Sequence, residues 1–579
     1  MAFHPKSWQG LAMRFWLVTV AILISEFIGK PGVWAHLPRY SEAEAAGWWR
    51  THSIPETWGP SGGELLNACR SHFDPARLDT WGPEYRGWYD LARWSQLGTA
   101  ETLSQAGLSP ETYIALARSS GLITAVLKAL HPKDNLAGVL ANLGALIRAD
   151  PDGVRDYPQL ATAMAVVWDR PFPSDWPHPQ VRRESLLLNQ GTVADRFNDL
   201  IAQERRGRLE FRLRDLSVEE LIFLVDTPVA ESEFIWARET FRTSLNQFDR
   251  VFFQVPYDQQ RLIGRAFDWP KEVPYSLANI LERGGICVDQ AYFAATVGKA
   301  RGIPTLLFMG QGRDGGHAWV GYLKRNRTWD LNVGRYAEQN YPVGTAFNPQ
   351  TWEPVLDSEL IHHTANVLRN SRYPEAAWLM RWAQENPEAP FYGDTVELAR
   401  TLLPAWIQPW RARAGWMEAT QVDARTQQDL LRAWIQQFSR MPDFKVEGQE
   451  RLAKVLAANG DAQGAQLVQQ EIIRQNRRKR FDLGLGAAVE TLVDRLDQKD
   501  WRGADLEFRR LVRQFDARSG GSLFYQVIKP YIETLCEERQ GRQARAALDF
   551  AIKNMAIDPE SILGMEFERL HTAITQAGG

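Results

Sequence analysis

The stretch "GGICVDQAYFAATVGKARGIP", residues 284–304, decides how the centre of this chain is interpreted. Cys287 stands one residue beyond a glycine pair, and residues 288–300 are compatible with a helix. Unpaired backbone N–H groups and the helix dipole favour negative charge at a helix N-terminus, which lowers the pKa of a thiol there. The stretch predicts either an accessible, low-pKa nucleophile or a small apolar residue buried where a helix begins.

Three β-like segments follow the predicted helix. They are residues 305–310 ("TLLFMG"), 317–323 ("HAWVGYL") and 327–333 ("RTWDLNV"). Together they predict a helix followed by an antiparallel sheet. Alternation along the second segment places His317 and Trp319 on one strand face. A histidine beside the thiol serves as its general base and later protonates the leaving amine.

A third group is needed to orient the imidazole through its other nitrogen, as an Asp or Asn does in known triads. Asp330 and Asn332 both qualify, and their spacing of two places them on one strand face. If residues 324–325 form a two-residue turn, Asn332 lies opposite His317 and Asp330 lies on the diagonal. The sequence leaves the choice between the two open.

These three motifs, in this order, resemble the transglutaminase-like cysteine enzyme superfamily. Here they read "GGICVDQAYFAATVGKARGIP", "GHAWVGY" and "TWDLN". The resemblance implies a papain-like domain with a Cys-His-Asp triad. In that family, a thioester forms with a peptide or carboxamide carbonyl and is passed to water or to an amine. Carried over by position, Cys287 is the nucleophile and His317 is the base.

The chain departs from the family pattern in two places. The family usually has Gly-Asp-Cys where this chain has Gly-Ile-Cys, and its acid usually follows the tryptophan by several residues within Leu-Asp-Pro. Asn332 therefore matches the third member better by position, and Asp330 matches it better by chemistry, so we expect Asp330 first. For the family's side-chain donor to the oxyanion, Trp269 and Gln260 are candidates.

The flanking regions are helical by pattern. Residues 36–215 show 3–4 residue apolar spacing, with many tryptophans that we expect to fill gaps between helices. Residues 370–579 carry a weak repeat in which Asp461, Asp500 and Gly541 are equivalent, as in tetratricopeptide-like helical hairpins. The predicted fold is thus multidomain and mainly α. Its predicted central α+β papain-like or transglutaminase-like domain, residues 216–354, is flanked by helical domains.

The N-terminal segment, the number of cysteines and the net charge indicate where the protein is located and which partners it binds. The first 35 residues read as a signal peptide or signal anchor, because a short apolar run precedes the small-residue pattern Val33-Trp34-Ala35. We therefore expect export, with membrane attachment only if the segment stays uncleaved. Three cysteines cannot form a disulfide scaffold, and a net charge of -3 provides no basic field for nucleic acid.

The predicted function is thiol-dependent acyl transfer on peptide or side-chain amide bonds, with hydrolysis favoured over amine crosslinking. The substrate is expected to be a protein or peptide, and the C-terminal hairpins are a possible surface for a protein partner. No cofactor or metal is expected, since the adjacent His362 and His363 point to different sides. The alternative is a non-catalytic scaffold or binding module that uses the helical repeats.

Overall fold

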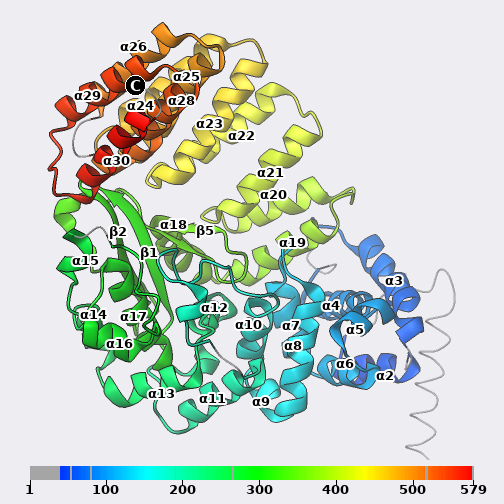
Figure 1. Ribbon diagram of the computed structural model, residues 1–579. Coiled ribbons are helices and arrows are strands. Elements are labelled where there is room, and N and C mark those ends of the chain that lie inside the picture. The colour runs from blue at the N-terminus through cyan, green and yellow to red at the C-terminus, as the bar shows by residue number, and fades with distance from the viewer. Residues whose placement is uncertain are drawn as a thin grey trace, which may run out of the picture.

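The computed structural model describes residues 40–52, 55–77, 81–188, 191–263, 266–515 and 519–576. The chain is mainly helical, with one five-stranded antiparallel sheet near its centre (Figure 1). The segment interpreted as a signal peptide, residues 1–35, lies outside the described residues. In the described part of the chain, no helix combines the length and apolar character needed to span a membrane.

The sheet has the strand order β3-β2-β1-β4-β5. The three strands predicted from sequence are confirmed as β1, β2 and β3, and two short strands extend the sheet beyond β1. Strand β2 lies between β1 and β3, so a side chain on β2 has neighbours from both. The bounds are β1 (Thr305–Gly312), β2 (Gly315–Leu323), β3 (Trp329–Val333), β4 (Thr345–Phe347) and β5 (Pro354–Leu356).

The expected two-residue turn between β2 and β3 is wrong. Leu323 pairs with Trp329, so five residues connect the strands, and the register shifts again between Val320 and Tyr322. Asn326 explains the wider turn, because its side-chain oxygen accepts hydrogen bonds from both the backbone N–H and the hydroxyl of Thr328. Each paired residue of β3 therefore lies opposite a residue of β2 other than the one that a two-residue turn would give.

The predicted central helix is confirmed as α17 (Cys287–Ala300), and all its residues are buried. It packs against β1 and β2, whose inward side chains include Ala318 and Val320 at zero exposure. Burial of a whole helix against a sheet fixes its rotation and its position along the strands, since every face has packing partners. Cys287 at its first turn is therefore held at a defined place beside β2.

Helices before α17 form the N-terminal half of the molecule. The six tryptophans at 48, 49, 58, 81, 88 and 94 are at most 5% exposed, which confirms that they fill the core between helices. The bounds are α2 (Glu42–Thr51), α3 (Pro55–His72), α4 (Pro83–Leu97), α5 (Ala100–Ala106), α6 (Pro110–Ala117), α7 (Ser120–Ala129), α8 (Leu136–Ala149), α9 (Pro151–Asp156), α10 (Pro158–Val167), η3 (Arg183–Ser185), α11 (Val193–Arg205), η4 (Leu213–Asp215), α12 (Val218–Val225), α13 (Glu231–Thr240), η5 (Leu245–Gln247), α14 (Asp249–Phe252), α15 (Gln259–Ile263) and α16 (Leu277–Arg283).

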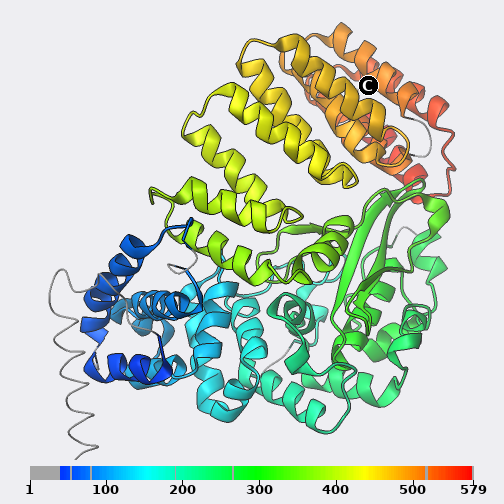
Figure 2. The ribbon, with the colours of Figure 1, turned by 180° about the vertical axis from the view of Figure 1, so that it is seen from behind.

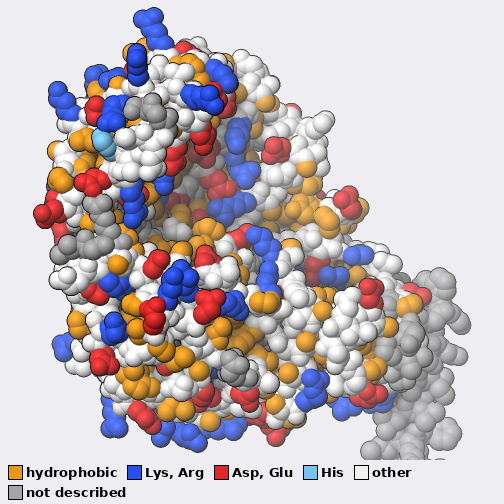
Figure 3. All heavy atoms as spheres, in the orientation of Figure 1, with side chains coloured by type: hydrophobic (Ala, Val, Ile, Leu, Met, Phe, Trp, Pro, Cys, Tyr) orange, Lys and Arg blue, Asp and Glu red, His pale blue; other side chains and the backbone are white. Residues whose placement is uncertain are grey.

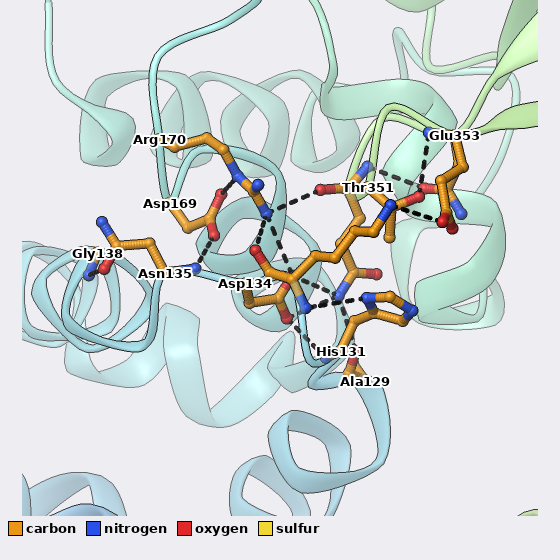
Figure 4. Close-up of polar contacts among 12 residues, drawn as sticks. Ala129, His131, Asp134, Asn135, Gly138, Asp169, Arg170, Thr351 and Glu353 are labelled. Atoms are coloured by element: carbon orange, nitrogen blue, oxygen red, sulfur yellow. Dashed lines mark hydrogen bonds and ion pairs between the residues drawn. The ribbon is translucent and has the colours of Figure 1, made fainter.

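One hydrophobic core extends from Ala45 to Leu403 and passes through the boundary expected at residue 215. A polar network also joins the two sides (Figure 4). Gln350, which follows β4, donates to the carbonyl of Ala129 at 2.8 Å and to the Asp134 carboxylate at 2.9 Å. Burial raises the pKa of Asp134 to about 6. The helical half and the sheet are packed as one body, and the division into domains stays a prediction.

The predicted C-terminal hairpins are present. Asp461 and Asp500 are the N-caps of α24 and α26 and are structurally equivalent, whereas Gly541 is the first residue of α29, one position after its N-cap Gln540. The bounds are α18 (Asp357–His362), η7 (His363–Leu368), α19 (Tyr373–Glu385), α20 (Tyr392–Leu402), α21 (Ile407–Ala419), α22 (Ala424–Gln437), α23 (Pro442–Ala458), α24 (Ala462–Asn476), α25 (Phe481–Asp497), α26 (Trp501–Gln514), α27 (Gly520–Leu523), η9 (Phe524–Ile528), α28 (Lys529–Glu537), α29 (Gly541–Met555) and α30 (Ile562–Gln576).

The helices from α21 to α30, here called the array, touch the rest of the molecule at both ends. The first end is tied to α18, where the Ser358 hydroxyl donates to Asp443 at 2.8 Å and the His362 ring lies 5.5 Å from that of Phe444. At the other end, α27 and α30 contact the β1–β2 hairpin, as Figures 1 and 2 both show. The array is an arch over the body, and the surface between them is hollowed (Figure 3).

Candidate active site

The glycine pair before Cys287 lets two backbone segments approach closely. Gly284 has φ of 82°, and a Cβ there would lie 2.6 Å from the carbonyl oxygen of Pro256. The amide of Gly285 donates to that same carbonyl at 2.9 Å, and its own carbonyl accepts from Asp258 at 3.0 Å. Only glycine fits this conformation without strain. The pairing brings Tyr257, which lies between the two contacts, beside the start of α17.

The Cys287 thiol lies at the first position of α17 and is buried, with 8% of the residue exposed. Burial raises its pKa to about 11, although backbone N–H groups, chiefly that of Ala318, favour the thiolate and oppose the shift. The nearby Asp289 carboxylate raises the pKa further. The expectation of an accessible, low-pKa thiol is therefore wrong for this conformation, because loss of water outweighs the helix N-terminus.

His317 lies on β2, and its Nε2 is 2.7 Å from the backbone carbonyl oxygen of Gly334. Since a carbonyl only accepts, Nε2 carries the proton in this contact and Nδ1 is the basic nitrogen of the neutral ring. Nδ1 makes no hydrogen bond to any described residue. Burial lowers the pKa of His317, which keeps the ring neutral and able to accept a proton.

Cys287 begins the helix that packs against β2, the strand that carries His317. The backbone N–H of Ala318, the residue that follows His317, favours the thiolate of Cys287 and so lies near the sulfur. Ala318 pairs with β1 on one side, and β3 pairs with β2 only from Val320 onward, so the edge of β2 beside Ala318 is open to the thiol. Nucleophile and base candidates thus lie at the point where β3 separates from β2.

Asp330 and Asn332, the predicted orienting residues, make no hydrogen bond to His317. Asp330 pairs with Tyr322, so the two share a face of the sheet, and Tyr322 lies on the face opposite to His317 because an odd number of positions separates them. The Asp330 carboxylate instead accepts from the Asn332 amide at 3.2 Å. Asn332 is exposed. The longer turn and the shifted register account for both displacements.

The carbonyl of Gly334 occupies the position expected for an Asp or Asn. Gly334 directly follows β3 and has φ of 85°, and a Cβ there would lie 2.5 Å from the Phe252 ring. This conformation turns the chain away from β2 and aims the carbonyl at His317. A backbone group leaves only a weak sequence signal, which here is a glycine immediately after a strand.

A buried polar network, here called the floor, lies beneath Cys287. Asp289 has no exposed surface, and its carboxylate accepts from the Ile286 amide at 2.9 Å, from Arg261 at 2.7 Å and from the Tyr275 hydroxyl at 2.9 Å. His178 Nε2 lies 2.8 Å from the same hydroxyl. Because that hydroxyl donates to Asp289, His178 is its donor. The floor fixes the turn that carries the thiol.

The loop between β3 and β4, residues 334–344 and here called the roof, lies on the other side of the thiol. The Tyr336 and Tyr341 rings lie 4.9 and 5.5 Å from the His317 ring, centre to centre. Burial, and after it the charge of the Cys287 thiolate, raises the pKa of both tyrosines and of Tyr257, so all three phenols lie near enough to the sulfur to interact with its charge. None of these hydroxyls has a hydrogen-bond partner among the described residues, so each is free to donate to a substrate oxygen.

The two oxyanion candidates named from sequence do not take that position. The Trp269 indole N–H already donates to the Val273 carbonyl at 2.9 Å, and the Gln260 side chain is exposed. Tyr257 was missed because it lies 30 positions before the cysteine, and only the backbone pairing with Gly285 connects them. Asp289, three positions after Ile286, could have been found as an acid in the first turn of a helix.

A cavity of about 970 Å³ is a separate feature. Its lining includes Lys128, Glu219, His363 and Trp406, and neither Cys287 nor His317 lines it. Within the described ranges, no group of three or more His, Cys, Asp or Glu side chains is arranged to hold a metal ion.

Comparison of the chain with protein-family models, with curated proteins and with solved structures finds no match.

Proposed function

We propose that the chain is a thiol-dependent acyl-transfer enzyme that acts on peptide or side-chain amide bonds, with Cys287 as nucleophile and His317 as base. One observation carries this proposal: Cys287 begins a buried helix that packs against the strand of a neutral histidine, and the backbone N–H next to that histidine favours the thiolate. The helix and sheet around this pair are what the resemblance to transglutaminase-like enzymes leads us to expect. That resemblance rests on three short motifs.

The reaction follows from the protonation states. His317 Nδ1 takes the thiol proton, the sulfur attacks the carbonyl carbon, and the oxygen of that carbonyl gains negative charge. The Cys287 and Ala318 amides and the tyrosine hydroxyls are the available donors to this oxygen. The C–N bond then breaks, the amine leaves with the proton from His317, and a thioester remains. Water, activated by His317, hydrolyses the thioester and restores the thiol.

The Gly334 carbonyl takes the role of orienting group in this proposal. It fixes the imidazole by accepting from Nε2–H, and its partial negative charge favours the imidazolium that forms during attack. A full carboxylate would stabilise that cation more strongly. We therefore expect slower turnover than a Cys-His-Asp triad with an aspartate in contact would give.

The proposal is tested with the purified full chain and a library of peptides and glutamine-containing donors, scored for released acid or ammonia by mass spectrometry. Cys287→Ala is expected to abolish all turnover, and Cys536→Ala, on α28, is the matched control that should retain it. A Cys287-dependent product that carries an added amine in place of water would assign crosslinking. Absence of any Cys287-dependent product across the library would reject the enzyme.

The second candidate, a non-catalytic scaffold, is favoured by one specific observation. In this conformation, the thiol is buried and its pKa is raised to about 11, so almost no thiolate exists near neutral pH. A scaffold would keep this state permanently, whereas an enzyme must leave it. Whether the site opens therefore separates the two functions.

A further inference from the structure

We infer that the far end of the array is a latch that keeps the Cys287 site closed. This end, α27 and α30, packs on the β1–β2 turn, and the turn is hydrogen-bonded to the roof. This inference deepens the proposed function, on which it rests for its biological meaning, by assigning a means of regulation to the same site. Access to the thiol can be measured without turnover, so the two proposals can fail separately.

The first link joins the array to the β1–β2 turn, residues 312–315. A Cβ on Gly520 would lie 2.2 Å from the Arg313 carbonyl oxygen, and one on Gly521 would lie 2.8 Å from the Gly312 carbonyl oxygen. The Leu563 amide, in the first turn of α30, donates to the Asp314 carbonyl at 3.1 Å. Such close backbone approach is possible only because both array residues are glycines.

The second link joins the turn to the roof through Gln339. The Arg313 amide donates to the Gln339 carbonyl at 2.8 Å, and the Asp314 amide donates to the Gln339 side-chain oxygen at 3.2 Å. The Gln339 side-chain nitrogen donates back to the Asp314 carboxylate at 2.9 Å. Three hydrogen bonds thus hold η6 (Ala337–Gln339), the middle of the roof, against the turn.

The third link joins the roof to the thiol. Gln339 lies between Tyr336 and Tyr341, the two tyrosines that pack on His317 and lie beside the Cys287 sulfur. The Tyr341 ring also packs against Gly312, where an added Cβ would lie 2.5 Å from it. Movement of the turn therefore displaces the rings that exclude water from the thiol.

The described contacts between the array and the β1–β2 turn are few, so this end of the array can separate from the turn. Its contacts among the described residues include glycine packing and one backbone hydrogen bond, together with the Arg569 guanidinium 5.8 Å from the Phe267 ring. A net contribution of about 1 kcal/mol is typical for one such hydrogen bond. Partial opening at this end costs little compared with unfolding of the molecule, so a partner that binds the array can shift the balance.

The test measures the alkylation rate of each cysteine by iodoacetamide at constant pH in the full chain, resolved by mass spectrometry. Gly520→Val should push the array from the turn and raise the rate at Cys287 on the order of tenfold or more. Cys69, which is fully buried in the N-terminal half, and Cys536, on α28, serve as internal standards and should not change. Gly448→Val is the matched control, since its Cβ meets Trp434 at 3.0 Å inside the array and far from the turn.

A second variant covers the case in which Gly520→Val unfolds the chain, which a faster rate at Cys69 would reveal. Gln339→Ala breaks the middle link without adding bulk, and the latch requires the same rise at Cys287. In the double variant, the rise should be no larger than the greater single effect, because both act on one chain of contacts. An unchanged Cys287 rate in Gln339→Ala, or in Gly520→Val with faster hydrogen exchange at residues 311–316, would overturn the latch.

Discussion

The two sides of Cys287 are built in opposite ways. The floor consists of fully buried charged and polar groups, in which the Asp289 carboxylate has donors from Ile286, Arg261 and Tyr275. The roof is a partly exposed loop whose tyrosine hydroxyls have no hydrogen-bond partner among the residues that the structure describes, and Tyr336 is 37% exposed. A buried, hydrogen-bonded network resists displacement, whereas a partly exposed loop can move into water at small cost. The difference suggests a fixed nucleophile beneath a movable cover.

The largest effect is expected in the floor. Asp289→Ala leaves the Arg261 guanidinium buried without its carboxylate and removes the cap of the Ile286 amide, so it should lower the free energy of unfolding by about 3–5 kcal/mol. Urea unfolding followed by circular dichroism measures this. Glu338→Ala, an exposed residue of the roof, is the control and should change stability by less than about 0.5 kcal/mol. Equal losses in the two variants would contradict the contrast between floor and roof.

The next largest effect is expected in the pH dependence of the free energy of unfolding, through His178 in the floor. Burial lowers the pKa of His178 to about 4, below the value near 6.5 of an unfolded histidine. The unfolded state therefore binds this proton first, and stability is lost as pH falls from about 6.5 to about 4, by up to about 3 kcal/mol. His178→Gln keeps a donor for Tyr275 and lacks this titration, so its stability should fall less over that range. If the free energy of unfolding falls equally with pH in both proteins, His178 does not contribute to the loss of stability in acid.

Substitutions in the roof should change the accessibility of the Cys287 thiol more than the free energy of unfolding. Tyr341→Ala removes a ring that packs on His317 and Trp319, and should speed alkylation of Cys287 by about ten- to a hundredfold with a stability loss of only about 1–2 kcal/mol. Tyr341→Phe, which keeps the ring, should react as the parent does. A large loss of stability without faster alkylation would make the roof part of the rigid core.

The pH profile of alkylation sharpens the same contrast. In the parent protein, the rate at Cys287 should rise by about tenfold per pH unit until pH 11 or so, because burial raises the pKa of the thiol to about 11. In Tyr341→Ala, water reaches the sulfur, and the inflection should move to lower pH. An inflection near pH 8.5 in the parent would show that the closed conformation is not the main one in solution.

The smallest effect is expected at the residues first chosen to orient His317. Asp330→Ala should change Cys287-dependent turnover by less than about threefold, since Asp330 lies on the other face of the sheet. The sequence pattern alone predicts a loss of two to four decades for the true orienting acid. A loss of that size would mean that β3 changes its register during catalysis. Gly334→Ala, which disturbs the carbonyl, is the comparison that should show the loss.

The parts of the molecule that could be predicted are those that depend on local pattern. The helix at Cys287, three of the strands and the equivalence of Asp461 with Asp500 follow from periodicity and capping, and the structure has them. The pairing of Cys287 with β2 followed from the order of elements. Each of these features is decided by residues close together in the sequence.

What could not be predicted depends on groups distant in sequence or on the backbone. The turn after β2 has five residues in place of two, and this difference, together with the register shift between Val320 and Tyr322, moves Asp330 and Asn332 away from His317. The Gly334 carbonyl carries no side-chain signal. The floor joins His178, Arg261 and Asp289, which are brought together only by tertiary packing. Burial of the thiol came from the roof, whose tyrosines no motif connects to the site.

The attachment of the array at both ends has a consequence for how this molecule can change during evolution. Open-ended helical repeats gain or lose units readily, since each repeat contacts only its neighbours. Here the span between α18 and the β1–β2 turn is set by the body, and one additional hairpin would carry Gly520 and Leu563 past the turn they touch. The number of hairpins is therefore fixed by the distance they bridge. Duplication of a repeat, which an open array tolerates, would here detach the far end of the array from the β1–β2 turn.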